Sequence, residues 1–168
     1  MKLRHLFFAC SGVFVMMFSL LLLVVIVFSD EEDGGSGGNL IFGGVSVSQE
    51  VLAHKPMLEK YAREYGIEEY LNVLLAIIQV ESGGTLEDVM QSSESLGLPP
   101  NSLSTEESIK QGCKYFSELL AAAETKGCDL NSVIQSYNYG GGFLDYVAGR
   151  GKKYTFELAE SFARDKSG

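Results

Sequence analysis

The segment around Glu81 combines a carboxylic acid, an apolar run and a flexible exit. Residues 71–78 are apolar except for Asn72, and Ser82 and two glycines follow the acid. Burial among apolar side chains disfavours the ionised carboxylate and raises its pKa, so such a group can stay protonated near neutral pH. A protonated carboxyl at the edge of open space can act as a general acid on a glycosidic oxygen. The alternative is a solvated glutamate on the last turn of a helix.

Two further segments carry side chains suited to a carbohydrate ligand. Residues 88–95 form a hydroxyl-rich stretch, and residues 136–142 place an aromatic and amide group directly before three glycines, which let a ligand approach the backbone. Structural alternatives are a surface loop residue at Gln91, a core tyrosine at Tyr137 and a turn residue at Asn138. The candidate binding side chains are Ser82, Gln91, Ser93, Glu94, Tyr137, Asn138 and Tyr139.

A glycosidase that uses water needs a second carboxylate at a set distance from the acid. Four acidic residues are candidates, and each has an alternative as a helix cap or a surface charge. Glu94 is favoured because it lies in the same stretch as Gln91. The four candidates are Asp88, Glu94, Asp129 and Asp145.

Three motifs together resemble a known family. In order and separation they resemble the Glu-Ser, Met-Gln and Tyr-Asn-x-Gly motifs of lytic transglycosylases and goose-type lysozymes. Their longer form is similar to the lysozyme-like domain of CwlT-type cell-wall hydrolases, and the resemblance covers about residues 48–165. Each motif alone is weak, whereas the three jointly are fairly specific. The matching residues are Glu81-Ser82-Gly83, Met90-Gln91 and Tyr137-Asn138-Tyr139-Gly140.

The resemblance implies a small helical lysozyme-like fold that cleaves the β-1,4 bond between N-acetylmuramic acid and N-acetylglucosamine in peptidoglycan glycan strands. It implies that Glu81 is the acid, that Ser82 and Gln91 hold the substrate, that Tyr137 orients the acid or the sugar, and that Asn138 binds the glycan. Tyr139 stands where the family motif has alanine. A muramidase is favoured.

Other functions stay open beside the muramidase. A lytic transglycosylase would need only one carboxylate, because the C6 hydroxyl of the muramyl sugar attacks internally and gives an anhydro product. A non-catalytic wall-binding or scaffold domain could keep the fold, although the presence of Glu81 argues against it. Since CwlT-type proteins are often encoded on conjugative elements, the resemblance also names a conjugation apparatus as a candidate partner.

The N-terminal part predicts a membrane anchor. Residues 6–28 contain no charged side chain, and this run is long enough to cross a hydrocarbon core of about 30 Å. Basic residues precede this run and acidic residues follow it, so residues 1–5 should be cytoplasmic and the rest of a single-pass membrane protein should face outward. A cleaved signal peptide is the alternative. Residues 29–45 are predicted to be a Gly-rich acidic linker, and residues 46–168 the extracellular domain.

Composition narrows the function classes. The chain carries 13 basic and 22 acidic residues, a formal net charge of −9 at pH 7. Nucleic acid is not an expected partner, because phosphate contacts need clustered basic residues. Cys113 and Cys128 should lie inside and just after one helix, about 20 Å apart, which is too far for a disulfide. His54 is the only histidine after the anchor, so no metal or other cofactor is expected.

Helical periodicity continues through most of the remaining chain, so the fold class is mainly α. Ser48, Ser104 with Glu107, and Asp129 read as N-terminal caps, and Gly127 as a helix end. Pro56 should kink the first helix or start a second one. The expected helices begin at residues 48, 68, 104, 129, 143 and 156, with an irregular stretch at 83–104.

Overall fold

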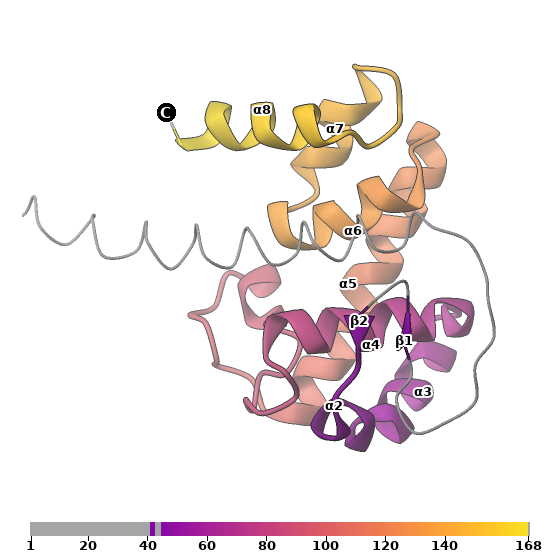
Figure 1. The fold of residues 1–168 in the computed structure, drawn as a ribbon, viewed down its shortest axis with the longest axis vertical. Coiled ribbons are helices and arrows are strands. Elements are labelled where there is room, and N and C mark those ends of the chain that lie inside the picture. Colours follow the sequence, from indigo (N-terminus) through magenta and orange to yellow (C-terminus); the bar gives the residue numbers. More distant parts are fainter. Residues whose placement is uncertain (1–40, 43–44, 168) are drawn as a thin grey trace, which may run out of the picture.

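The structure is a computed structural model that describes residues 41–42 and 45–167, and over this range the fold is mainly helical, as predicted (Figure 1). The two short strands pair antiparallel. The elements in chain order are β1 (Ile41–Phe42), β2 (Val45–Ser46), α2 (Gln49–Ala53), α3 (Lys55–Glu64), the 3-10 turn η1 (Glu68–Tyr70), α4 (Leu71–Glu81), the 3-10 turn η2 (Ser92–Leu96), α5 (Thr105–Lys126), α6 (Leu130–Tyr139), α7 (Gly142–Ala148) and α8 (Phe156–Ser167).

The predicted caps are confirmed. The Ser48 hydroxyl accepts a hydrogen bond from the N–H of Val51 at the start of α2. Ser104 and Glu107 form a capping box at the start of α5, and Gly127 ends that helix in the left-handed conformation. Short side-chain bonds to free N–H groups therefore set the helix boundaries that the sequence indicates.

The helix pair at the N-terminal side resolves one open alternative. Pro56 lies in the first turn of α3, so it starts a second helix and does not kink a longer one. His54 lies between the two helices, and its Nε2 atom is 2.9 Å from the carbonyl oxygen of Gly84. This contact ties the α2–α3 junction to the loop after α4.

Helix α4 supplies the centre of the core. Its residues 73–78 are all buried, because the segment is apolar on most faces. In Figure 1, α5 spans the molecule, with α2, α3 and α4 towards one end and α7 and α8 at the other. Packing contacts join α5 to α3, η2, α6 and α7, so this helix fixes every element around it.

A second, smaller hydrophobic cluster lies between α7 and α8. Its buried members are Phe143, Val147, Ala159 and Phe162, with Tyr139, Tyr146 and Tyr154 packed against them. Edge-on contacts among the aromatic rings hold α8 in place, with ring centroids 5.3 Å apart between Phe143 and Phe162. The C-terminal helix therefore depends on aromatic packing.

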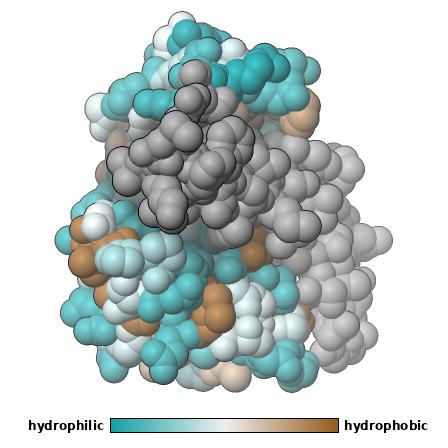
Figure 2. Space-filling model, turned by 90° about the vertical axis from the view of Figure 1, so that its left-hand side faces the viewer, coloured by the Kyte–Doolittle hydropathy of each residue, from teal (hydrophilic) through white to brown (hydrophobic). Residues whose placement is uncertain are grey.

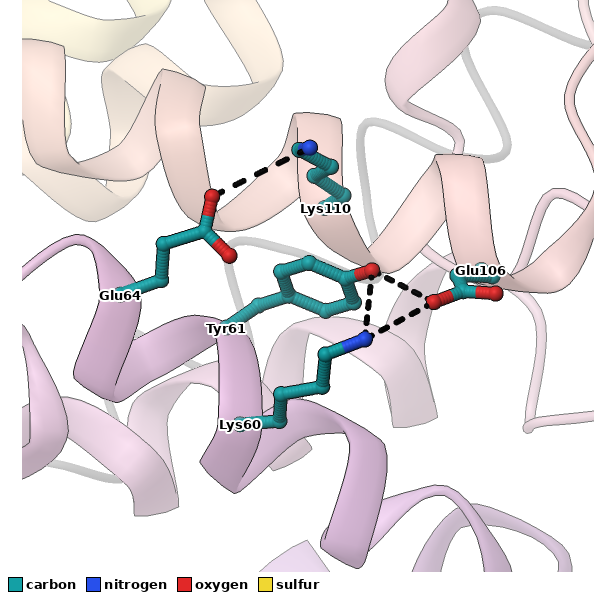
Figure 3. Close-up of polar contacts among 5 residues, drawn as sticks. All are labelled: Lys60, Tyr61, Glu64, Glu106 and Lys110. Atoms are coloured by element: carbon teal, nitrogen blue, oxygen red, sulfur yellow. Dashed lines mark hydrogen bonds and ion pairs between the residues drawn. The ribbon is translucent and has the colours of Figure 1, made fainter.

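A polar network joins α3 to α5 on the surface (Figure 3). The Tyr61 hydroxyl donates to a Glu106 oxygen at 2.6 Å, and Lys60 Nζ donates to the same oxygen at 3.0 Å. Lys110 forms a longer ion pair with Glu64 at 3.9 Å. Because exposed ion pairs contribute about 0–1 kcal/mol, the buried ring of Tyr61 is the stronger part of this joint.

The predicted membrane anchor, residues 6–28, lies outside the described residues. Within the described part of the chain, no helix combines the length and the apolarity that crossing a bilayer requires. The β1–β2 hairpin begins inside the stretch assigned to the linker, and Val47 directly after it is fully buried. Cys113 and Cys128 are both free thiols.

Candidate active site

Glu81 is the last residue of α4, and Ser82 leaves the helical conformation directly after it. The side chain is partly buried. Burial raises the pKa of the Glu81 carboxyl to about 8, and the negative charges of Glu94 and Asp88 add to the shift. The carboxyl is therefore protonated at neutral pH, which is the state that a general acid needs.

Ser82 closes the loop that follows the acid. Its hydroxyl donates to the carbonyl oxygen of Val89 at 2.7 Å and accepts from the N–H of Gly84 at 3.0 Å. Gly84 has a φ of +78°, and a Cβ there would lie 2.7 Å from backbone atoms of Glu50 and Val51. Ser82 thus uses its side chain within the protein, and its role in holding substrate stays a prediction.

Asp88 organises the next part of the loop. It is fully buried, and its carboxylate accepts from the N–H groups of Ser92 at 3.0 Å and Ser93 at 3.3 Å. The Ser108 hydroxyl donates to it at 2.6 Å, and that hydroxyl in turn accepts from the N–H of Met90. With these bonds Asp88 fastens the loop to α5 and is not free to activate a water molecule.

Gln91 also serves the loop. Its φ is +47°, and its Nε2 atom donates to the Asp88 carbonyl at 2.9 Å and to Asn101 Oδ1 at 2.8 Å. Ser93 differs, because its buried hydroxyl has no hydrogen-bond partner among the described residues. Glu94 is exposed and near enough for its charge to act on Glu81.

Tyr137 joins the second and third motifs. Only 8% of it is exposed, and its hydroxyl donates to the carbonyl oxygen of Met90 at 3.1 Å. Burial raises the pKa of this hydroxyl, with a further contribution from the charge of Glu81. The residue is thus a core tyrosine, as the structural alternative held, and it is near enough to Glu81 for that charge to act on it.

The two residues after Tyr137 have different surroundings. Asn138 is partly buried, and its Nδ2 atom has no hydrogen-bond partner in the described part of the chain. The ring of Tyr139 stacks on Phe162, with centroids 5.6 Å apart and planes 13° from parallel, and meets Phe143 edge-on. Tyr139 therefore packs in the second cluster, and its contact with a glycan stays a prediction.

The other two candidate carboxylates lie elsewhere. Asp129 caps α6 through the N–H of Ser132 and accepts from the N–H of Tyr154. Asp145 is exposed and pairs with Lys126 at 3.0 Å. Glu94 is thus the one exposed member of the four whose charge acts on Glu81. No three His, Cys, Asp or Glu residues of the described ranges form a group that could hold a metal ion.

The family described as lysozyme-like matches residues 48–168. The chain belongs to the lysozyme-like family. Over 121 residues the lysozyme-like domain is 45% identical to the bifunctional muramidase/DL-endopeptidase CwlT of Bacillus subtilis (strain 168), a match that covers 71% of this chain and 36% of that protein. The family resemblance that the three motifs indicate is confirmed.

Two other curated relatives match the same domain. The uncharacterized membrane protein YocA of Bacillus subtilis (strain 168) is 38% identical, with 71% of this chain and 54% of that protein covered. Pneumococcal vaccine antigen A of Streptococcus pneumoniae serotype 4 is 33% identical, with 70% and 58% covered. The chain therefore spans between 36% and 58% of the length of these three relatives.

A solved structure has the same fold. The crystal structure of a protein similar to a lipoprotein of the NLP/P60 family, from Staphylococcus aureus subsp. aureus Mu50, superposes with a TM-score of 0.74 at 75% sequence identity. The match covers 74% of this chain and 42% of that one.

Sequence reasoning missed one residue on which the motifs of the lysozyme-like domain depend. A Cβ at Gly112 in α5 would lie 2.5 Å from Met90 Sδ and 2.9 Å from the Tyr137 hydroxyl oxygen. The absent side chain is what lets the Met-Gln and Tyr-Asn motifs meet on α5. The available signal was a glycine inside an amphipathic helical pattern.

The surface of the domain has exposed apolar side chains and a hollow. The coloured part of the face seen in Figure 2 is mostly hydrophilic, with small hydrophobic patches in its lower half. Leu86, Leu96 and Leu98, which lie between α4 and α5 in the sequence, are between 42% and 50% exposed. A hollow of about 500 Å³ is lined by Tyr65 and Tyr70 among others. It lies near the start of α4, at the other end of that helix from Glu81, and so is separate from the candidate active site.

Proposed function

We propose that this protein is a membrane-anchored peptidoglycan glycosidase that cleaves the β-1,4 bond between N-acetylmuramic acid and N-acetylglucosamine, with Glu81 as the general acid. The observation that carries the proposal is the place of Glu81, at the point where the buried helix α4 ends and a polar loop begins. Burial there raises the pKa of its carboxyl to about 8. At neutral pH the carboxyl holds the proton that the leaving sugar oxygen must receive. Membership of the lysozyme-like family and the similarity to CwlT support the same chemistry.

Hydrolysis is favoured over internal attack because one second carboxylate is available. Glu94 is exposed and acts on Glu81 by charge, whereas Asp88 is enclosed by hydrogen bonds. In this proposal Glu94 lies on the side of the sugar opposite to the acid. There it activates the attacking water molecule or stabilises the positively charged transition state, which makes the enzyme a muramidase. A lytic transglycosylase needs no such partner, because the sugar attacks internally. Its product carries an anhydro end, whereas the product of a muramidase carries a reducing end.

The membrane anchor belongs to the same proposal. Residues 6–28 would hold the domain of residues 46–168 on the outer side through the linker 29–45, within a short distance of the bilayer. The relative YocA bears the name of a membrane protein, which supports this arrangement. Attack would then be limited to the glycan strands nearest the membrane.

The full chain carrying Glu81→Gln tests the acid. We expect release of soluble fragments from purified peptidoglycan to fall at least about a hundredfold, because the amide cannot donate the proton. Circular dichroism should be unchanged. Glu87→Gln is the matched control, because Glu87 is an exposed carboxylate in the same loop. This variant should cleave peptidoglycan like the unaltered chain. Undiminished cleavage by Glu81→Gln would contradict the assignment.

The pH profile and the products sharpen the test. Since the protonated form is the active one, the rate should fall as pH rises through about 8. Glu94→Gln removes a like charge and should move that fall to lower pH in any activity that remains. Reducing ends in the mass spectrum of the products mean hydrolysis, anhydro ends mean transglycosylation, and no cleavage products from the unaltered chain would leave only a wall-binding role.

A further inference from the structure

Gln135 in α6 is a buried amide that the proposed reaction does not use. The residue is fully buried, and neither its Nε2 nor its Oε1 atom has a hydrogen-bond partner among the residues that the structure describes. Native proteins pair nearly all buried polar atoms, because an unpaired one loses its bonds to water without replacement. A side chain with both donor and acceptor unsatisfied therefore needs an explanation.

The position of Gln135 relates it to the glycan-binding motif. Gln135 precedes Asn138 by three residues on α6, so the two amides lie on the same side of the helix. Val133, Ile134 and Tyr137 of the same helix belong to the main hydrophobic core. Asn138 repeats the pattern, since its Nδ2 atom is also buried without a partner in the described chain, while the residue keeps some exposed surface. The two neighbouring amides thus share unpaired buried atoms, and of the two residues Asn138 is the one that keeps exposed surface.

We infer that Gln135 is a specificity-determining residue that binds an N-acetyl group of the glycan strand beside Asn138. This inference rests on the proposed function. A primary amide offers a donor and an acceptor side by side, and the acetamido group of the sugar offers an acceptor and a donor in return, so two hydrogen bonds can form at once. Such pairing would satisfy both orphaned atoms of Gln135 with one ligand group.

Burial makes this pairing selective. A site built to bond a polar group rejects an analogue that lacks it, because the protein atoms are then left unpaired. Glycan strands from which the N-acetyl groups have been removed should therefore be cleaved poorly. The discrimination comes from the protein side, so it should disappear when the amide of Gln135 is replaced by an apolar group of similar length.

The test compares the full chain with Gln135→Met on N-acetylated strands and on the same strands after chemical N-deacetylation. For the unaltered chain we expect kcat/KM to be about tenfold or more higher on acetylated strands. In Gln135→Met that ratio should fall to near one, mainly through loss on acetylated strands. The melting temperature should stay equal or rise, because an unpaired buried amide is exchanged for an apolar side chain.

Gln79→Met is the matched control. The Gln79 amide has a protein partner, the N–H of Ser48 at 2.7 Å, so this variant should melt lower and keep the ratio of the unaltered chain. An unchanged ratio in Gln135→Met would overturn the inference. So would a clear fall in its melting temperature, which would mean that the amide is satisfied inside the fold. The inference can fail in this way while Glu81→Gln still abolishes cleavage, so its failure is distinguishable from failure of the proposed function.

Discussion

The loop after α4 and the region formed by α6, α7 and α8 differ in how many buried polar side-chain atoms the fold leaves without a partner. In the loop, residues 82–93, the side chains of Ser82, Asp88 and Gln91 are all hydrogen-bonded within the protein, with Ser93 as the exception. In the second region, polar atoms of Gln135, Asn138 and Tyr154 are buried without partners among the described residues.

This difference in hydrogen bonding suits the two regions to different tasks, placing the acid and recognising the substrate. A loop whose polar groups bond one another holds its shape before substrate arrives, and the acid at its start needs that fixed geometry. Polar atoms that the fold leaves unpaired are free to bond a ligand, at some cost in stability. Under the proposed function, the loop therefore places Glu81, and α6 recognises the sugar.

Asp88→Ala should break the loop most severely. The substitution leaves three donors without an acceptor in a fully buried place, so we expect the free energy of unfolding to fall by about 3 kcal/mol. Urea unfolding followed by circular dichroism measures the loss. Cleavage should also fall under conditions where the variant is still folded, because the loop no longer holds its shape.

Asp145→Ala is the control for this loss. Asp145 is an exposed carboxylate whose one ion pair, with Lys126, is open to solvent on the Asp145 side, so its removal should change stability by less than about 0.5 kcal/mol. If Asp88→Ala were no more harmful than Asp145→Ala, the loop would not be held by its buried carboxylate.

Local sequence signals were enough to predict the helices. Ser104 and Glu107 predict the start of α5, and Gly127 predicts its end, because capping depends on residues within one turn. The apolar run that ends at Glu81 likewise predicts a buried helix with an acid at its edge, and its surroundings raise the pKa as that pattern requires. Such features are local, and so the chain alone reveals them.

Contacts between distant segments could not be predicted in this way. Asp88 was a candidate second carboxylate by sequence, and only its approach to Ser108 on α5 reveals it as a structural group. Gly112 and Gln135 carry no motif of their own; their importance comes from what lies beside them after folding. Glu94 was chosen for its place in the same stretch as Gln91, and the role of Asn138 was taken from the family resemblance; both roles remain predictions.

Gly112→Ala should push the loop after α4 away from α6. The new methyl group would overlap Met90 Sδ and the Tyr137 hydroxyl, which costs about 1–3 kcal/mol, against a gain of about 1 kcal/mol in helix propensity. We expect a net loss of up to about 2 kcal/mol in urea unfolding and a lower cleavage rate. Gly142→Ala is the control, because a Cβ there meets no atom within 4 Å, and it should be neutral or slightly stabilising.

A pair of Tyr→Phe substitutions compares the two regions with the same chemical change. Tyr137→Phe removes a hydroxyl that donates to Met90 and leaves that buried carbonyl unpaired, so the free energy of unfolding should fall by about 1 kcal/mol. Tyr154→Phe removes a buried hydroxyl that has no partner in the described chain, so stability should be unchanged or slightly higher. Thermal unfolding of both variants side by side measures the difference. Equal losses would mean that the hydroxyl of Tyr154 is satisfied after all, and the contrast between a bonded loop and an unpaired α6–α8 region would then not hold at this residue.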